Sequence, residues 1–528
     1  MRSLIRLMLV LFVLALTASP RAAPATTDPD RARPDARIAS RAIVHGRGVS
    51  SSQPRSTSFD VFGQRERAAS RLRATTAPET RAPSSLLGFD AQGPNVEDAK
   101  PSDTIGALGD TFFVTAVNAR VAVYDRLGIE LVPPTPLESL HPDSAGRFAF
   151  DPKVIYDQYN DTFVLVYLVQ EDFPRRSRII AVAIPDATAT DQSTWCSTSF
   201  PGDALPGAPA VWADYPGLGY NQDRVTVTSN QFTFPSSQGQ FRFAQVMSIP
   251  KGPLYDCTQP SPTPDVFAGT QTRDANGIQA FTLQPAQTVG TPASTQLLAS
   301  VELAGRNSYL VLWRIKETAT RVIMKKGTVR IGRTTFPPLG TQRGGGINNR
   351  DLWWDAGDMR LINAYFDADR NELFAAHAVA KNFRPDPVTG GYLESAARWY
   401  EVTPATRLNN STLARKGTIG APEVDVGWPS VATDASGNLF VTYSRAGSPG
   451  NEFLSAWVAE VAPNGTAAAQ VLLAPGLDTY DAIPGPERWG DFTGISRDPV
   501  VPANLATFNQ YALDRLTWQQ VVNVITHS

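Results

Sequence analysis

One short motif recurs along this chain at fairly regular intervals. It reads Asp-Pro-Lys-Val-Ile-Tyr-Asp at 151–157 and Trp-Pro-Ser-Val-Ala-Thr-Asp at 428–434. In both copies a Pro stands five residues before the final Asp, and a Phe follows six residues after it. Weaker copies centre on Gly106, Asn221, Asp367 and Asp498, and segment 291–303 fills the remaining gap. A repeat of this kind predicts seven similar units from about residue 100 to the C-terminus.

Each unit contains several short apolar runs that are typical of β-strands. A further strand follows each anchor, at 120–125, 178–185, 241–250, 309–315, 398–404, 453–463 and 516–525. Four of these runs end at Pro, which cannot donate to a strand ladder. A looser fourth strand is expected at 327–331 and 414–419.

Four-stranded sheets repeated around an axis form a propeller, and closing the ring protects the sheet edges. We therefore predict an all-β chain folded as a β-propeller, with seven four-stranded blades and with six or eight as alternatives. An all-β array that does not close, or a pair of sandwiches, is the competing interpretation.

The N-terminal part differs in composition from the repeats. Arg2 and Arg6 precede an apolar run from Leu7 to Leu16, followed by small residues around Ala23. Ten apolar residues are too few to cross a bilayer, so residues 1–25 are predicted to be a signal peptide; an uncleaved anchor is the alternative. Residues 26–85, rich in Arg, Ala, Ser and Pro, are predicted to be a flexible segment, and residues 86–528 the propeller. The expected location is outside the cell or in a periplasm.

The chain has two cysteines, Cys196 and Cys257. In an exported protein such a pair predicts a disulfide, although two free thiols are an alternative. Each cysteine follows the third strand of its unit, so the bond would tie the outer edges of neighbouring blades.

Composition excludes several classes of function. The formal net charge is −2, so no basic field favours nucleic acid. The four histidines form no His-Glu-x-x-His motif, and neither a Gly-x-Ser-x-Gly elbow nor a phosphate-binding loop is present.

Loops that lead into the first strand of a blade reach one rim of the channel. Two of them match closely, Trp-Ala-Asp-Tyr-Pro-Gly at 212–217 and Trp-Gly-Asp-Phe-Thr-Gly at 489–494. The first interpretation is architectural, because Trp can wedge between blades and Asp can cap a strand. The second is a shared ligand site. The residues expected to bind a ligand are Trp212, Asp214, Tyr215, Trp354, Asp355, Arg360, Trp428, Arg488, Trp489 and Asp491.

Carboxylates that converge at the rim suggest two kinds of chemistry. Asp214, Asp358 and Asp491 could ligate Ca²⁺, which prefers oxygen ligands. Two carboxylates could instead act as acid and base on a glycosidic bond, with Trp faces stacking on sugars. No catalytic residue is assigned from the sequence.

The repeats resemble those of secreted bacterial propellers of the sialidase-like superfamily. The Asp-Ala-Ser-Gly-Asn-Leu-Phe turn at 434–440 is similar to the Asp-box of that group, but lacks the Trp that normally follows the Gly. This resemblance in blade pattern implies the fold and export, and it does not transfer sialidase activity.

The leading functional prediction is a non-enzymatic, extracellular propeller that binds a glycan or a protein at the channel mouth. The alternative is a glycoside hydrolase or polysaccharide lyase that uses the rim carboxylates. We expect a monomer with no nucleic-acid partner and no membrane span after signal removal.

Overall fold

The computed structural model describes residues 82–93, 100–203, 210–274, 276–304, 307–345, 349–385, 393–461 and 468–527. The predicted signal peptide and nearly all of the predicted flexible segment lie outside these residues. The described chain is dominated by β-strands. Its helical elements are η1 (Leu137–Ser139), η2 (Asp186–Thr188), η3 (Gln192–Thr194), η4 (Ser236–Gln238), α4 (Lys251–Tyr255), η5 (Arg350–Leu352) and η6 (Leu408–Asn410). None of these helices is long and apolar enough to cross a membrane.

The strands pair as antiparallel runs of four. The first strands of the runs are β2 (Ile105–Leu108), β6 (Phe148–Asp157), β10 (Val211–Tyr220), β14 (Gln284–Val289), β18 (Asn363–Asp367), β22 (Asp425–Thr433) and β26 (Gly494–Arg497). The second strands are β3 (Phe112–Val117), β7 (Thr162–Asp172), β11 (Arg224–Thr233), β15 (Gln296–Ala304), β19 (Glu372–Lys381), β23 (Leu439–Gly447) and β27 (Asn504–Ala512).

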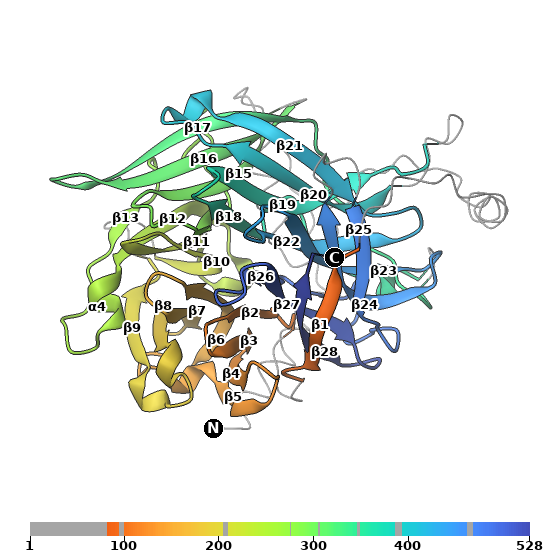
Figure 1. Cartoon of the computed structure of the whole chain (residues 1–528), viewed down its shortest axis with the longest axis horizontal. Helices are drawn as coiled ribbons and strands as arrows, with labels where there is room; N and C mark the ends of the chain where they lie inside the picture. Colours follow the sequence, from red (N-terminus) through yellow and green to blue (C-terminus); the bar gives the residue numbers. More distant parts are fainter. Residues whose placement is uncertain are drawn as a thin grey trace, which may run out of the picture. The chain divides into compact units, whose positions relative to one another are not determined.

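The outer half of each run completes the pattern. The third strands are β4 (Arg120–Asp125), β8 (Arg175–Pro185), β12 (Phe241–Pro250), β16 (Asn307–Glu317), β20 (Glu394–Thr403), β24 (Glu452–Val461) and β28 (Trp518–Thr526). The fourth strands are β5 (Glu130–Pro136), β9 (Cys196–Pro201), β13 (Asp265–Phe267), β17 (Val322–Gly332), β21 (Thr412–Ile419), β25 (Ala468–Ala474) and β1 (Ser84–Asp90). In Figure 1, β2, β6 and β10 lie toward the middle, and β5, β9, β13 and β17 lie at the outside.

The first strands contact one another in cyclic order. β2 contacts β6, the contacts continue in sequence to β26, and β26 contacts β2. Among the described strands, only β10, β14 and β18 join through parallel ladders, so hydrogen bonds between first strands do not run all the way around. A common space lies between the first strands: one cavity is bordered by Ile105, Lys153, Leu218, Gln284, Asn363 and Ile495.

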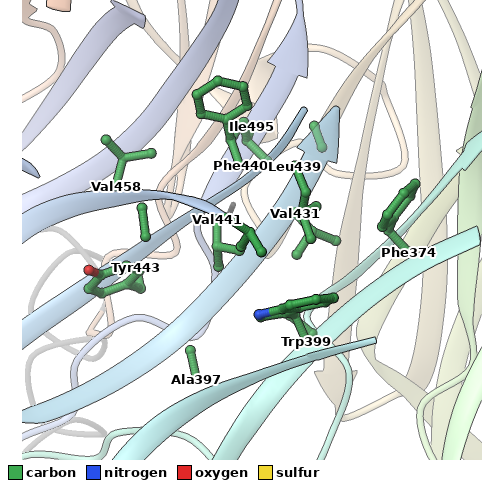
Figure 2. Close-up of a cluster of buried hydrophobic side chains, with 14 of the residues drawn as sticks. Phe374, Ala397, Trp399, Val431, Leu439, Phe440, Val441, Tyr443, Val458 and Ile495 are labelled. Carbon is green, nitrogen blue, oxygen red and sulfur yellow. The ribbon is translucent and has the colours of Figure 1, made fainter. Parts of the chain in front are cut away.

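Neighbouring runs pack through shared apolar clusters, because alternate residues of a strand point to opposite faces of its sheet. Figure 2 shows one such cluster, in which Phe374 and Trp399 of the run from β18 to β21 lie beside Val431 and Val441 of the next run. Another cluster joins Phe508 of the last run to Phe113 of the first. Burial of this kind on both faces is what a ring of packed sheets requires.

The last run takes its fourth strand from the other end of the described chain. β1 pairs antiparallel with β28, with Phe89 opposite Val522. β1 begins at Ser84, two residues before the domain boundary predicted at 86. The sequence prediction had placed a fourth strand within each unit and did not foresee this exchange.

The predicted disulfide joins Cys196 and Cys257, whose Cα atoms are 5.5 Å apart. Cys196 starts β9, the outermost strand of the second run, and Cys257 follows α4 in the third run. The bond therefore ties two neighbouring runs at their outer edges, as predicted. Closing so long a loop stabilises the fold by roughly 4 kcal/mol in the chain-entropy model.

Candidate functional site

The backbone bends sharply where several first strands begin. Asp151, Tyr215 and Trp428 have φ values of 51°, 53° and 54°, and each precedes a Pro. A β-bulge accompanies each of them in β6, β10 and β22. Asp103, just before β2, has a φ of 50°. Left-handed backbone costs about 1–2 kcal/mol per non-glycine residue, and a bulge re-aims side chains, so the repeat holds these side chains at one end of the strands.

Nine charged or ionisable side chains gather at this end, and we call them the mouth cluster: Asp103, Asp151, Lys153, Asp214, Asp355, Asp358, Arg360, Arg488 and Asp491. They come from the first, second, third, fifth and seventh runs. Six carboxyl groups face only three cationic groups. The excess of carboxyl groups decides how protons are distributed among them.

Three carboxyl groups of the mouth cluster form a chain of neighbours. Asp151 lies between Asp103 and Asp214 and acts electrostatically on both of them. Burial raises the pKa of all three groups, and their neighbours add to the shift: the Asp151 charge for Asp103 and Asp214, and the Asp491 charge for Asp151. Protons are therefore retained in this chain above the usual range of an Asp.

Protein groups hold the inner end of the chain in place. Asp103 is fully buried; its Oδ2 accepts from the Asn118 amide at 2.7 Å and its Oδ1 accepts from the Asp491 backbone N–H at 3.2 Å. Asp151 Oδ2 accepts from the Tyr215 backbone N–H at 3.0 Å. Asp214, at the outer end, keeps part of its surface exposed. The chain thus runs from the protein interior to solvent.

Two arginines pair with the remaining carboxylates. Arg488 Nη2 lies 2.9 Å from Asp491 Oδ2, and Arg360 Nε lies 2.8 Å from Asp358 Oδ2. Burial alone would lower the pKa of Arg360, but the carboxylates around it outweigh burial and the pKa is raised. The Arg360 guanidinium also stacks over the Tyr215 ring at 4.1 Å. Both arginines remain charged and are fixed in orientation.

Lys153 brings a buried amine to the cluster. Its Nζ lies 3.3 Å from the centre of the Phe492 ring, and its side chain borders the central cavity. Burial lowers the pKa of Lys153 to about 7, although Asp103, Asp151 and Asp491 oppose the shift. An amine with such a pKa can exchange protons near neutral pH.

The lead-in loops of the fifth and seventh runs are joined by backbone bonds. The Asp355 N–H donates to the Glu487 carbonyl at 2.9 Å, and the Trp428 indole N–H donates to the Asp355 carbonyl at 2.8 Å. Burial, followed by the Asp491 charge, raises the pKa of Asp355 to about 6. Asp355 still keeps part of its surface exposed.

The structure brings the loops at 212–217 and 489–494 together. The Tyr215 and Phe492 rings lie 4.9 Å apart, and the Tyr215 hydroxyl donates to the Asp491 carbonyl at 3.3 Å. Seven of the ten predicted binding residues have a charged or hydroxyl group or, for Trp212, a partly exposed ring. They are Trp212, Asp214, Tyr215, Asp355, Arg360, Arg488 and Asp491.

The other three predicted binding residues are buried tryptophans. Trp354, Trp428 and Trp489 pack in one apolar cluster with Tyr480 and Trp518. Gly490, with a φ of +96°, lets Trp428 approach so closely that a Cβ at this position would lie 2.6 Å from the indole. Their surroundings match the architectural interpretation of these residues.

The predicted Ca²⁺ site remains a prediction. Among the described residues, no group of three or more His, Cys, Asp or Glu side chains is arranged to hold a metal ion. Asp358 and Asp491 pair with arginines, and Asp214 lies beside Asp151.

Sequence reasoning missed Asp103, Asp151 and Lys153. A signal for Asp151 was present, because the motif at 151–157 aligns it with Tyr215 of 215–221 and Trp428 of 428–434. All three precede Pro, six residues before the Asp or Asn that ends the strand.

Comparison with solved structures finds proteins of low similarity to this chain. The chain is similar to a protein of unknown function from Dyadobacter fermentans (10% identity, TM-score 0.40, 71% of this chain and 94% of the other). It is also similar to a GH93 α-L-arabinofuranosidase of Fusarium graminearum (10%, 0.37, 83% and 98%) and to Trypanosoma rangeli sialidase (8%, 0.36, 80% and 59%). A sialidase is thus among the solved structures to which the chain is similar. No protein-family model and no curated protein matches the sequence. Likeness this distant says nothing about activity.

Proposed function

We propose that the chain is an exported seven-bladed β-propeller. Support comes from the seven runs of four strands, the cyclic contacts of the first strands and the completion of the last run by β1. The positive start and apolar run of the N-terminus support export. The disulfide supports it as well, since such bonds persist in oxidising compartments.

The mouth cluster, in this proposal, hydrolyses a glycosidic bond of an extracellular glycan. The observation that carries the proposal is the chain of three neighbouring carboxyl groups, those of Asp103, Asp151 and Asp214, whose pKa values are all raised. Glycoside hydrolysis uses a carboxylic acid that keeps its proton near neutral pH and a second, ionised carboxylate. The cluster supplies a candidate for each role, because burial raises the pKa of Asp214 well above its ordinary value and Asp491 is paired with Arg488.

We assign Asp214 as the acid, because it is the end of the chain that retains exposed surface. It donates its proton to the glycosidic oxygen as the bond to the anomeric carbon breaks. Asp491 is assigned as the carboxylate that acts on water or on the anomeric carbon. Asp151 is a positioning residue that sets the protonation of Asp214. Sugar hydroxyls suit such a mouth, since each can donate to a carboxylate and accept from an arginine.

Binding without turnover is the second candidate function. It is favoured by the ion pairs of Arg360 with Asp358 and of Arg488 with Asp491, which already engage both guanidinium groups within the protein. A site whose arginines are already paired with carboxylates can bind a glycan or a protein surface without catalysing a reaction.

One experiment separates the two candidates. Protein beginning at residue 82 is incubated with arabinan, xylan, pectin and a sialylated glycoprotein, and both retention and released sugars are measured. We expect release from one substrate, and a loss of about 10²–10⁴-fold in Asp214→Asn with retention unchanged. Glu372→Gln, at the opposite end of the strands, is the matched control and keeps full release. Retention without release supports the binding candidate, and neither retention nor release refutes both.

A further inference from the structure

Aromatic side chains are distributed unequally between the two rims of the molecule. The three phenylalanines with large exposed fractions are Phe148 (56%), Phe173 (87%) and Phe336 (41%). All three lie at the rim of the mouth cluster, in or before first strands or in the turn from β7 to β8. At the opposite rim, the exposed large hydrophobic residues among the described ones are aliphatic, such as Leu127 in the turn from β4 to β5 and Val500 in the turn from β26 to β27.

The rings at the mouth rim form a continuous series across three runs, which we call the aromatic track. Successive ring centres are 5.1, 6.5, 5.4, 5.8 and 4.9 Å apart. The members are Phe148, Phe150, Trp212, Phe232, Phe241 and Phe281. Phe148, Trp212, Phe241 and Phe281 keep exposed surface, while Phe150 and Phe232 are buried beneath them.

Phe148 has the geometry of a stacking platform. Its ring is stacked on Phe150 with an interplanar angle of 12°, so one face is supported by protein and more than half of the side chain remains exposed. Flat, supported rings match the apolar C–H face of a sugar ring, whereas aliphatic side chains offer no such plane.

The track leads directly to the carboxyl chain. Trp212 and Asp214 stand two residues apart in β10, in a stretch that is regularly paired with β11, so both point to the same side of the strand. A chain of sugars lying on Phe148 and Trp212 would therefore continue toward Asp214.

The hairpin tips beside the track are fixed rather than free. Asp172, next to Phe173, accepts from the Ser236 backbone N–H and from its hydroxyl, both at 2.9 Å. This bridge joins the turn after β7 to the turn after β11. It holds Phe173 in its exposed position, where no packing among the described residues accounts for it.

We infer that the aromatic track binds several consecutive sugar residues of a linear polysaccharide and feeds the chain to the mouth cluster. The ligand is thus a polymer rather than a single terminal sugar, because the track extends from the second run to the loop before β14. This inference rests on the proposed function for the role of the mouth cluster, but binding at the track does not require that catalysis occurs.

The test measures retention in native gels that contain soluble arabinan, xylan or pectin. Phe148→Ala and Trp212→Ala, alone and together, are compared with Leu127→Ala, an apolar side chain that is 74% exposed at the opposite rim. We expect the double variant to lose at least about tenfold in affinity for the polymer that retains the natural protein, and Leu127→Ala to lose none. Equal thermal stability of all variants checks that the fold is intact.

The outcomes distinguish this inference from the proposed function. Sugar release from a small aryl glycoside that is unchanged in Phe148→Ala, with weakened retention of the polymer, supports the track and the active site together. Weakened retention without any release by the natural protein supports the track alone. Unchanged retention of the double variant would contradict polysaccharide binding at the aromatic track. A natural protein that is retained by no polysaccharide would contradict it as well. After either result, a protein surface would be the remaining ligand for these exposed rings.

Discussion

Asp355 provides a measure of how much the ionised carboxyl groups of the mouth cluster lower the stability of the fold. Its pKa rises from 3.8 to about 6, first through burial and then through the Asp491 charge. The folded state therefore binds this proton more tightly than the unfolded state does. The contribution of Asp355 to stability is highest below about pH 4, falls as the pH rises through about 6, and then stays level.

A pKa difference of this size corresponds to roughly 3 kcal/mol, and partial exposure reduces this to about 1–3 kcal/mol. Asp355→Asn removes the charge and keeps the bond that Oδ1 accepts from the Gly357 N–H at 2.9 Å. We expect the variant to melt about 1–3 °C higher than the natural protein at about pH 8, with no gain at about pH 4. Differential scanning calorimetry at the two pH values measures the difference.

Asp425 is the matched control, because burial also raises its pKa to about 6. Its carboxylate accepts from the backbone N–H groups of Thr341 and Ser395 and from the Thr341 hydroxyl. An Asn at this position loses at least one acceptor, so Asp425→Asn should melt lower at both pH values. A gain for Asp355→Asn that is equal at both pH values, or no gain at pH 8, would refute the reasoning from burial and the neighbouring charge.

Three further predictions concern the frame that carries the site. Replacing Cys196 and Cys257 by Ser should lower stability by up to about 4 kcal/mol, seen as a lower melting temperature that reductant no longer changes; a reductant-sensitive melt in this variant would contradict the assignment. Gly490→Ala should lower the melting temperature strongly, because its Cβ would meet Trp428 at 2.6 Å on a left-handed backbone, whereas Gly252→Ala, which meets nothing within 4 Å, should cost much less. Protein that begins at residue 82 should keep the melting temperature of longer forms, and protein that begins at residue 91 should melt lower, because it lacks β1 and exposes the edge of β28; equal melting of the two would show that β1 is not needed.

The repeating part of the architecture could be predicted from local sequence patterns. Turn residues that recur at a fairly regular interval, together with alternating apolar strands, predicted the all-β class and the fourth strands near 327–331 and 414–419. These features are local, because period-two alternation and turn residues act within a few positions. The disulfide was also within reach, since only two cysteines are present.

How residues from different repeats combine could be seen only in the folded molecule. Asp103, Asp151 and Asp214 belong to three different runs, and nothing in their own segments indicates that their carboxyl groups are neighbours. Trp354, Trp428 and Trp489 occur in sequence surroundings similar to those of Trp212. These three are nevertheless buried, whereas Trp212 is partly exposed, because burial depends on which neighbouring sheet covers each ring. β1 joins β28 from the opposite end of the described chain for the same reason: this pairing depends on where the last run lies in the folded molecule, and no single segment encodes it.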